Sequence, residues 1–170
     1  KKLVFFKLIE ISMENVLSDQ PILDLNISSQ TLVFKIKGFT KSYSISSAKN
    51  GVGQLSGSGC TPLGHHQVRA KIGRDAALNA VFKGRRLTGE IYSPELSVKF
   101  PKRDWILTRI LWLSGKERGY NRLGSVDSMR RYIYIHGTPD TEPMGIPLSH
   151  GCIRMRNADL IELFDIVPVG

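Results

Sequence analysis

The sequence has 170 residues, a length that fits one globular domain with a hydrophobic core of its own. Hydrophobic residues make up 41% and charged residues 23%, which are ordinary fractions for a folded soluble domain and exclude an intrinsically disordered chain. The net charge of +9 comes from the stretch between Arg69 and Arg131, which holds fifteen basic and six acidic side chains. Such a stretch attracts anionic partners or forms a solvated basic face. Because no nucleic-acid-binding motif accompanies it, we do not expect nucleic acid as a partner.

The first eleven residues begin with a lysine pair and an apolar run, as a secretion signal does. Lys7 and Glu10 interrupt this run, however, and no small-residue cleavage site follows it. The alternation fits a strand better, and four apolar side chains would share one side of it: Leu3, Phe5, Ile9 and Ile11. No stretch approaches the roughly 18 apolar residues of a membrane span. We therefore expect no membrane span and treat residues 1–30 as an N-terminal extension of unclear role, with a signal removed by processing as an alternative.

From Thr31 onward, apolar residues recur at every second position, which is the pattern of strands with one buried face. The pattern predicts strands at residues 32–36, 43–45, 68–72, 106–113 and 131–135. The last of these runs into His136 and would hold that side chain rigidly. Two glycine-containing stretches, 50–64 and 114–128, are expected to be loops, and the second is a candidate lid.

One amphipathic helix is expected near the C-terminus. Asn157 is a good N-cap residue, Asp159 suits the positive end of the helix, and Pro168 ends the apolar pattern. The predicted buried face consists of Leu160, Ile161, Phe164 and Val167. The fold class expected from these patterns is mainly β with a short C-terminal helix.

The candidate nucleophile is Cys152. A thiol attacks a carbonyl as its thiolate, and a free cysteine with a pKa of about 8.5 is mostly protonated at neutral pH, so a nearby imidazole or other positive group is needed. His136 lies sixteen residues before Cys152 and His150 two residues before it. Gly151 permits a tight turn that could aim backbone N–H groups at a developing oxyanion. The other cysteine, Cys60, is not expected to pair with Cys152, and two cysteines are too few for a disulfide scaffold.

Two arginines follow the cysteine at alternate positions, Arg154 and Arg156. In an extended chain both would face one side and could clamp a substrate carboxylate. Each of these signals is weak by itself, since a single histidine or cysteine is more often structural.

The combination of signals resembles a known family. Ile-His-Gly-Thr at residues 135–138 and Pro-Met-Gly-Ile-Pro-Leu-Ser-His-Gly-Cys-Ile-Arg-Met-Arg-Asn-Ala-Asp at residues 143–159 resemble the signature of the L,D-transpeptidase catalytic domain, the YkuD-like family. Thr-Pro-Leu-Gly at 61–64 and Ser-Ser-Ala at 46–48 extend the resemblance upstream. It covers residues 31–170, which we assign as the catalytic domain. It implies two packed mixed sheets, a β-sandwich-like arrangement, with a helix.

The resemblance also implies roles for individual residues. Cys152 matches the nucleophile and His136 the general base, whose imidazole the backbone carbonyl of Gly137 orients. His150 and Gly151 match residues of the oxyanion and acyl pocket. Three further positions match residues of substrate binding or support: Ser149, Arg154 and Asn157. For Asn157 the helix cap is the alternative role, and no cofactor is implied.

The activity implied by the resemblance is a transfer of peptidoglycan stem peptides. The donor is a tetrapeptide stem cut before its terminal D-alanine, which leaves a thioester on Cys152. An amine acceptor then gives a cross-link or an exchanged terminal D-amino acid, whereas water gives an L,D-carboxypeptidase. Carbapenem-type inhibitors would acylate the same thiol, and the implied location is the periplasm or cell envelope.

Two other classes of function remain as alternatives. His136, His150 and Cys152 are residue types that bind zinc, but their spacing fits no standard zinc motif and no further ligand stands out, so we expect no metal. A non-catalytic β-domain that binds cell-wall polymer would explain the charge and the strands. It leaves the Ser-His-Gly-Cys sequence without an explanation.

Overall fold

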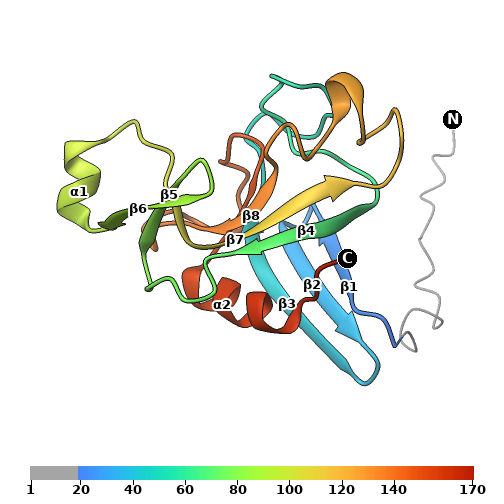
Figure 1. Cartoon of the computed structure of the whole chain (residues 1–170), viewed down its shortest axis with the longest axis horizontal. Helices are drawn as coiled ribbons and strands as arrows, with labels where there is room; N and C mark the ends of the chain where they lie inside the picture. Colours follow the sequence, from blue (N-terminus) through green and yellow to red (C-terminus); the bar gives the residue numbers. More distant parts are fainter. Residues whose placement is uncertain (1–18) are drawn as a thin grey trace, which may run out of the picture.

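The computed structural model describes residues 19–170 (Figure 1). The strand expected in the first eleven residues lies outside this range. The strands are β1 (Ile22–Asn26), β2 (Thr31–Ile36), β3 (Phe39–Ser46), β4 (His66–Ile72), β5 (Ala80–Lys83), β6 (Arg86–Ile91), β7 (Ile106–Gly115), β8 (Tyr134–Gly137) and β9 (Ile153–Met155). The helices are α1 (Pro94–Lys99), the short 3-10 helix η2 (Gly124–Val126) and α2 (Asn157–Ile166).

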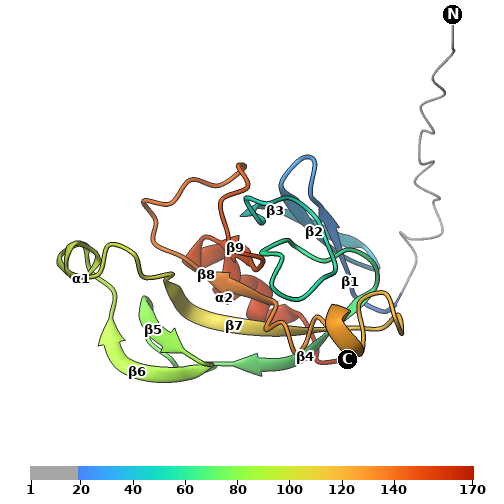
Figure 2. The ribbon, with the colours of Figure 1, turned by 90° about the horizontal axis from the view of Figure 1, so that it is seen from above.

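The strands follow one hydrogen-bonded path in the order β1-β2-β3-β9-β8-β7-β5-β6, and β4 pairs with the other part of β7. The path is antiparallel except between β8 and β9, which run parallel. Two sheet sections result, one of β1–β3 and one built on β7, and they are joined where the end of β3 pairs with β9. Figure 2 shows the first section above β7. The mainly β fold with a C-terminal helix is confirmed.

The main core lies between the two sheet sections and α2. It combines side chains from β2 and β3 with those of β4, β7, β8 and β9 and of the helix: Leu32, Phe34, Tyr43, Ile45, Val68, Leu111, Ile135, Ile153, Met155, Leu160, Leu163 and Phe164. A smaller cluster on the opposite side of β8 contains Phe82, Ile110 and Tyr134, with Cys152 packed against it. Strands β8 and β9 therefore separate the main core from the surface that carries the cysteine.

Most predicted strands are present, with shifted ends. The stretches 68–72 and 106–113 become β4 and β7, and the stretch 50–64 is a connection. The strand expected at 131–135 begins later, because residues 128 to 132 form a turn in which Arg131 N–H donates to Asp127 O. His136 consequently lies inside β8. The N-terminal 1–30 region contributes β1, which pairs along its whole length with β2.

The sequence analysis did not anticipate the β5–β6 hairpin or α1. The signal for α1 was present, since Ser93 caps the helix by accepting a hydrogen bond from Leu96 N–H and Pro94 occupies the first turn. Neither α-helix in residues 19–170 is long and apolar enough to cross a membrane.

The predicted cap of α2 is wrong. Arg156 occupies the cap position, and Asn157 is the first helical residue. The buried Asn157 amide instead ties three segments together: its oxygen accepts from Thr108 Oγ1 at 2.7 Å, and its nitrogen donates to Thr138 O at 2.9 Å and Asn79 Oδ1 at 3.1 Å. The buried face of the helix also differs, because Leu163 rather than Ile161 packs into the core.

We predict that Asn157→Ser destabilises the protein by about 2 kcal/mol, because serine is an equally good cap but lacks the amide that satisfies Thr108, Thr138 and Asn79 in the interior. Urea unfolding followed by circular dichroism measures the loss. Asn26→Ser is the matched control, since Asn26 accepts one exposed hydrogen bond from Ser29 N–H. Equal, small effects of both substitutions would contradict the assigned role of Asn157.

Candidate active site

The turn before β9 is built around the hydroxyl of Ser149. Its Oγ donates to Cys152 O at 2.5 Å and accepts from Gly151 N–H at 3.2 Å, so the four residues close on themselves. Gly151 has a φ of +133°, a conformation that side-chain-bearing residues rarely adopt. The sequence Ser-His-Gly-Cys therefore folds into a tight turn that fixes the backbone at Cys152.

Both upstream motifs brace this turn. The Thr61 hydroxyl donates to Gly151 O at 3.0 Å and accepts from Ala48 N–H at 2.9 Å. Ser47 O accepts from Ser149 N–H at 2.9 Å. The stretches 46–48 and 61–64, which are distant in sequence, thus converge on the segment that carries the cysteine.

The parallel pairing of β8 and β9 brings the histidine and cysteine segments together. Ile135 pairs with Ile153 and His136 with Arg154. Ile135 and Ile153 belong to the main core, and side chains alternate along a strand, so His136 and Arg154 point to the other face. Cys152 also packs on that face.

His136 is completely buried, and its Nδ1 lies 2.8 Å from Gly137 O. A carbonyl only accepts, so Nδ1 carries the proton of the neutral ring and Nε2 keeps a lone pair. Nε2 is buried without a hydrogen-bond partner among the described residues. Burial lowers the pKa of His136, against the opposing effects of Asp104 and of the Gly137 carbonyl. The ring is therefore neutral at neutral pH and has one nitrogen available to accept a proton.

The residue after this histidine must be glycine for steric reasons. A Cβ at position 137 would overlap the Asn157 Oδ1 atom and approach Leu107 O to 2.6 Å. Since the Gly137 carbonyl sets the imidazole tautomer, the close packing of β8 against Asn157 and β7 also fixes which nitrogen faces the site.

Cys152 is half-buried, and its thiol lies against backbone groups of the same strand region. Its Sγ lies 3.4 Å from Tyr132 O and accepts from Tyr134 N–H at 3.4 Å. Desolvation raises the pKa of the Cys152 thiol to about 12, although Tyr134 N–H and nearby arginines favour the thiolate. Cys152 thus has a neutral thiol and His136 a neutral imidazole, on the same strand face.

A carboxylate that the sequence analysis missed, Asp104, occupies the entrance to this face. It pairs with Arg154 at 2.7 Å and lies 3.4 Å from His150 Nδ1. Burial alone raises its pKa, but electrostatic interactions with His136 and with its partner Arg154 hold the pKa below its ordinary value. No local motif marks Asp104 in the sequence, because its partners lie more than thirty residues away.

Arg154 and Arg156, which were expected to bind a substrate carboxylate, instead bind groups of the chain itself. The Arg154 side chain is only 8% exposed and contacts Asp104 and, at 3.4 Å, Glu142. Arg156 donates to Asp140 O instead. His150 is largely exposed and lies next to Asp104. In residues 19–170 no three potential ligands gather to hold a metal ion, and both cysteines are free thiols.

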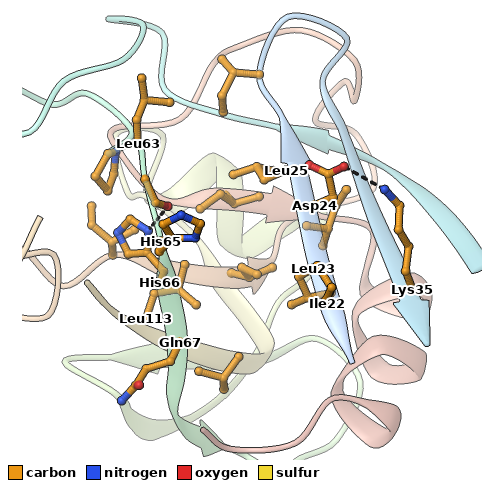
Figure 3. Close-up of a pocket in the computed structure, with 18 residues that line it drawn as sticks. Ile22, Leu23, Asp24, Leu25, Lys35, Leu63, His65, His66, Gln67 and Leu113 are labelled. Carbon is orange, nitrogen blue, oxygen red and sulfur yellow. Dashed lines mark hydrogen bonds and ion pairs between the residues drawn. The ribbon is translucent and has the colours of Figure 1, made fainter. Parts of the chain in front are cut away.

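Two cavities lie on opposite faces of β8 and β9. One, of about 400 Å³, is lined by His150, Arg154, Asp104 and Glu142 on the side of the catalytic candidates. The other, of about 440 Å³, lies between β1 and β4 and is lined mainly by apolar side chains, with the Asp24–Lys35 ion pair at its edge (Figure 3). Ile135 and Ile153, which line the second cavity, face the main core, so this cavity is separated from Cys152.

Comparison with known proteins identifies the fold and the motif. The L,D-transpeptidase catalytic domain profile (YkuD) matches residues 20–170. A segment of 40 residues is 50% identical to the probable L,D-transpeptidase YbiS of Escherichia coli, and one of 41 residues is 49% identical to the putative L,D-transpeptidase YkuD of Bacillus subtilis. Each segment covers 24% of this chain, but 13% of YbiS and 25% of YkuD.

Solved structures share the whole fold at low sequence identity. L,D-transpeptidase 3 of Mycobacterium tuberculosis aligns with a TM-score of 0.53 and 16% identity over 88% of this chain and 58% of its own. A cysteine-to-serine variant of the Enterococcus faecium L,D-transpeptidase gives 0.52 and 15% over 89% of this chain and 48% of its own. The chain thus spans about half the length of these proteins. Because the family profile covers nearly all of the described residues, the chain belongs to the L,D-transpeptidase catalytic domain family, YkuD.

Proposed function

We propose that this domain is a cysteine L,D-transpeptidase that transfers peptidoglycan stem peptides, with Cys152 as nucleophile and His136 as general base. The observation that carries the proposal is the neutral, buried imidazole whose Nε2 has no partner within the described chain, on the same strand face as Cys152. A buried nitrogen without a hydrogen bond lowers the stability of the fold, so its presence calls for an explanation, and accepting a proton during the reaction provides one.

In the first half-reaction, the Cys152 sulfur attacks the carbonyl of the diamino residue of the donor while its proton passes to His136 Nε2. The amide of Cys152 has no acceptor among the described residues and can donate to the oxyanion, whereas Gly151 N–H is already bonded to Ser149. Collapse of the tetrahedral intermediate breaks the C–N bond, and the imidazolium returns its proton to the leaving D-amino acid. A thioester on Cys152 remains.

In the second half-reaction, an acceptor amine attacks the thioester carbonyl and loses its proton to His136. Expulsion of the Cys152 thiolate, which regains that proton, releases the new amide and restores the free enzyme. A stem amine gives a cross-link and a free D-amino acid gives an exchanged stem. Water in place of the amine gives the L,D-carboxypeptidase alternative, which uses the same residues.

Asp104 and Arg154 support this site electrostatically. The Asp104 charge favours the imidazolium that forms during catalysis, and Arg154 neutralises part of that charge in the resting enzyme. The non-catalytic polymer-binding alternative gives no reason for the unpartnered nitrogen of His136. A periplasmic or cell-envelope location follows from the proposed substrate.

Relatives support an acylated thiol. LdtMt1, 19% identical to this chain with a TM-score of 0.51, was solved in complex with imipenem, and L,D-transpeptidase 3 of Mycobacterium tuberculosis with a faropenem-derived adduct. We extend this behaviour to the present chain and expect carbapenem-type inhibitors to acylate Cys152.

We predict that imipenem forms one covalent adduct that maps to Cys152, and that Cys152→Ala abolishes both the adduct and product formation from tetrapeptide donors. Intact-protein mass spectrometry and muropeptide analysis measure the two effects. Cys60→Ala is the matched control, because Cys60 is the other free thiol and its Sγ donates to the backbone carbonyls of Asn50 and Ser58. An adduct on Cys60, or turnover by Cys152→Ala, would refute the assignment of the nucleophile.

We predict that the acid limb of the acylation rate has its midpoint below about pH 6.5 and that the rate is nearly independent of pH from about pH 7.5 upward. Burial lowers the pKa of His136, so at the ordinary histidine pKa more than half of the imidazole is already neutral and able to accept a proton. The rate of imipenem acylation, measured across this range, provides the test. A mechanism that needs a preformed thiolate would instead rise tenfold per pH unit, because the pKa of Cys152 is raised to about 12.

Asp104→Asn provides a control for this pH profile. Loss of the negative charge removes an interaction that raises the pKa of His136, so the acid limb is expected to move to lower pH. A limb that moves to higher pH, or does not move, would show that another group titrates.

A further inference from the structure

The hairpin of β5 and β6 has an arginine at its tip in an unusual conformation. Lys83 pairs with Arg86, which leaves a two-residue turn of Gly84 and Arg85. Both have positive φ, +56° and +67°, as a type I′ turn requires. Glycine or asparagine adopts the second position easily, whereas arginine is strained there. The strain is tolerated because the side chain is held by tertiary contacts.

Three aromatic residues hold the Arg85 guanidinium. Its central carbon lies 4.4 Å from the ring centroid of Trp112 and 4.9 Å from that of Tyr132, and its Nη1 donates to the Tyr134 hydroxyl at 3.0 Å. Trp112 is itself fixed, because its indole N–H donates to Met129 O at 3.2 Å. The guanidinium thus lies over two aromatic rings and is hydrogen-bonded to a third aromatic side chain.

The same tyrosines contact the candidate nucleophile. Tyr132 O and Tyr134 N–H are the two groups that lie 3.4 Å from Cys152 Sγ. Trp112 and Cys152 also pack against one hydrophobic cluster with Tyr134. Arg85 therefore lies one tyrosine side chain away from the sulfur, on the active face.

Arg85 has no anionic partner within the described part of the chain. None of the ion pairs among residues 19–170 involves it, and of its five N–H donors only one at Nη1 has an acceptor there. Arg154, across the site, is already paired with Asp104 and Glu142. Arg131 directs its donors to backbone carbonyls and to a serine hydroxyl. Arg69 also lies over Trp112, at 5.7 Å, whereas Arg85 lies closer, at 4.4 Å, and contacts both tyrosines next to Cys152. Arg85 therefore has donors free for a ligand beside the candidate nucleophile.

We propose that Arg85, stacked on Trp112 and Tyr132, binds a carboxylate of the peptide that reacts at Cys152. A planar, half-buried guanidinium without a counterion favours a carboxylate held by two parallel hydrogen bonds. The inference rests on the proposed function for the identity of the peptide, but not for the existence of the anion site. If Arg85 only held the hairpin in place, a ligand with a carboxylate and its neutral counterpart would react equally well at Cys152.

The test compares two probes that differ by one charge: N-bromoacetyl-glycylglycine with a free carboxylate and the same compound as its C-terminal amide. The Cys152 sulfur displaces bromide from either probe to form a thioether, without any transpeptidase turnover. Peptide mapping gives the rate at Cys152 and, as an internal reference, at Cys60. We expect wild type to prefer the carboxylate probe at Cys152 but not at Cys60, and salt to weaken the preference.

Arg85→Gln should reduce this preference at Cys152 about fivefold, because a charge-assisted hydrogen-bonded contact is lost at a half-exposed site. Arg86→Gln, which removes the same charge from the neighbouring exposed residue, should change it by less than about twofold. Arg85→Lys keeps the charge but not the planar fork and should retain part of the preference.

Three results would overturn the proposal: no carboxylate preference in wild type, equal slowing of both probes in Arg85→Gln, or equal effects of Arg85→Gln and Arg86→Gln. The first needs no variant, so the test does not depend on whether Arg85→Gln folds. If the probes support the site while stem peptides are not turned over, the proposed function fails and the anion site stands.

Stem peptides with a free or amidated C-terminus then identify the source of the carboxylate. If Arg85→Gln no longer distinguishes the free from the amidated C-terminus during acylation, the carboxylate belongs to the donor peptide. If that distinction is lost during aminolysis of the thioester, the carboxylate belongs to the acceptor peptide. Discrimination unchanged in both half-reactions would refute the assignment to a stem peptide.

Discussion

The candidate site depends on the parallel pairing of two short strands, β8 and β9. Their register places His136 opposite Arg154 and leaves Cys152 directly before β9, on the face away from the main core. Each strand is short, so its position is determined by its neighbours: β7 flanks β8, and the end of β3 flanks β9. The reactive groups are thus carried by the centre of the sheet path, where backbone movement is most restricted.

A buried polar network behind β8 adds a second constraint. Strand β7 has a register irregularity between Leu107 and Ile110, and within it Thr108 has a φ of +70°, which is exceptional for a β-branched residue. The bulge turns the Thr108 hydroxyl toward Asn157, whose amide in turn fills the space that a side chain at Gly137 would need. The geometry of the histidine is therefore set from behind by an asparagine on α2.

The electrostatics of the site favour neutral resting groups. Burial lowers the pKa of His136 and raises that of Cys152, so charge separation occurs only as the substrate reacts. Arg154 and Arg85 differ correspondingly: the first is neutralised by two carboxylates of the chain, and the second lies over aromatic rings without a counterion among residues 19–170. This contrast distinguishes an arginine that organises the site from one that is available to a ligand.

The sequence by itself determined the elements that local patterns encode. Alternation predicted β4 and β7. The residue types of His136, Gly151 and Cys152 indicated the chemistry, and the motif that contains them resembles that of the family, because these residues lie in short, contiguous segments of the chain. It failed at Asn157, since a residue suited to a helix cap found better partners in the interior. Only the tertiary structure could reveal the contacts of Asp104, the hydrogen bond between Thr108 and Asn157, and the aromatic side chains around Arg85. Their roles depend on contacts across tens of residues, and no local pattern specifies which distant segments the sheet brings together.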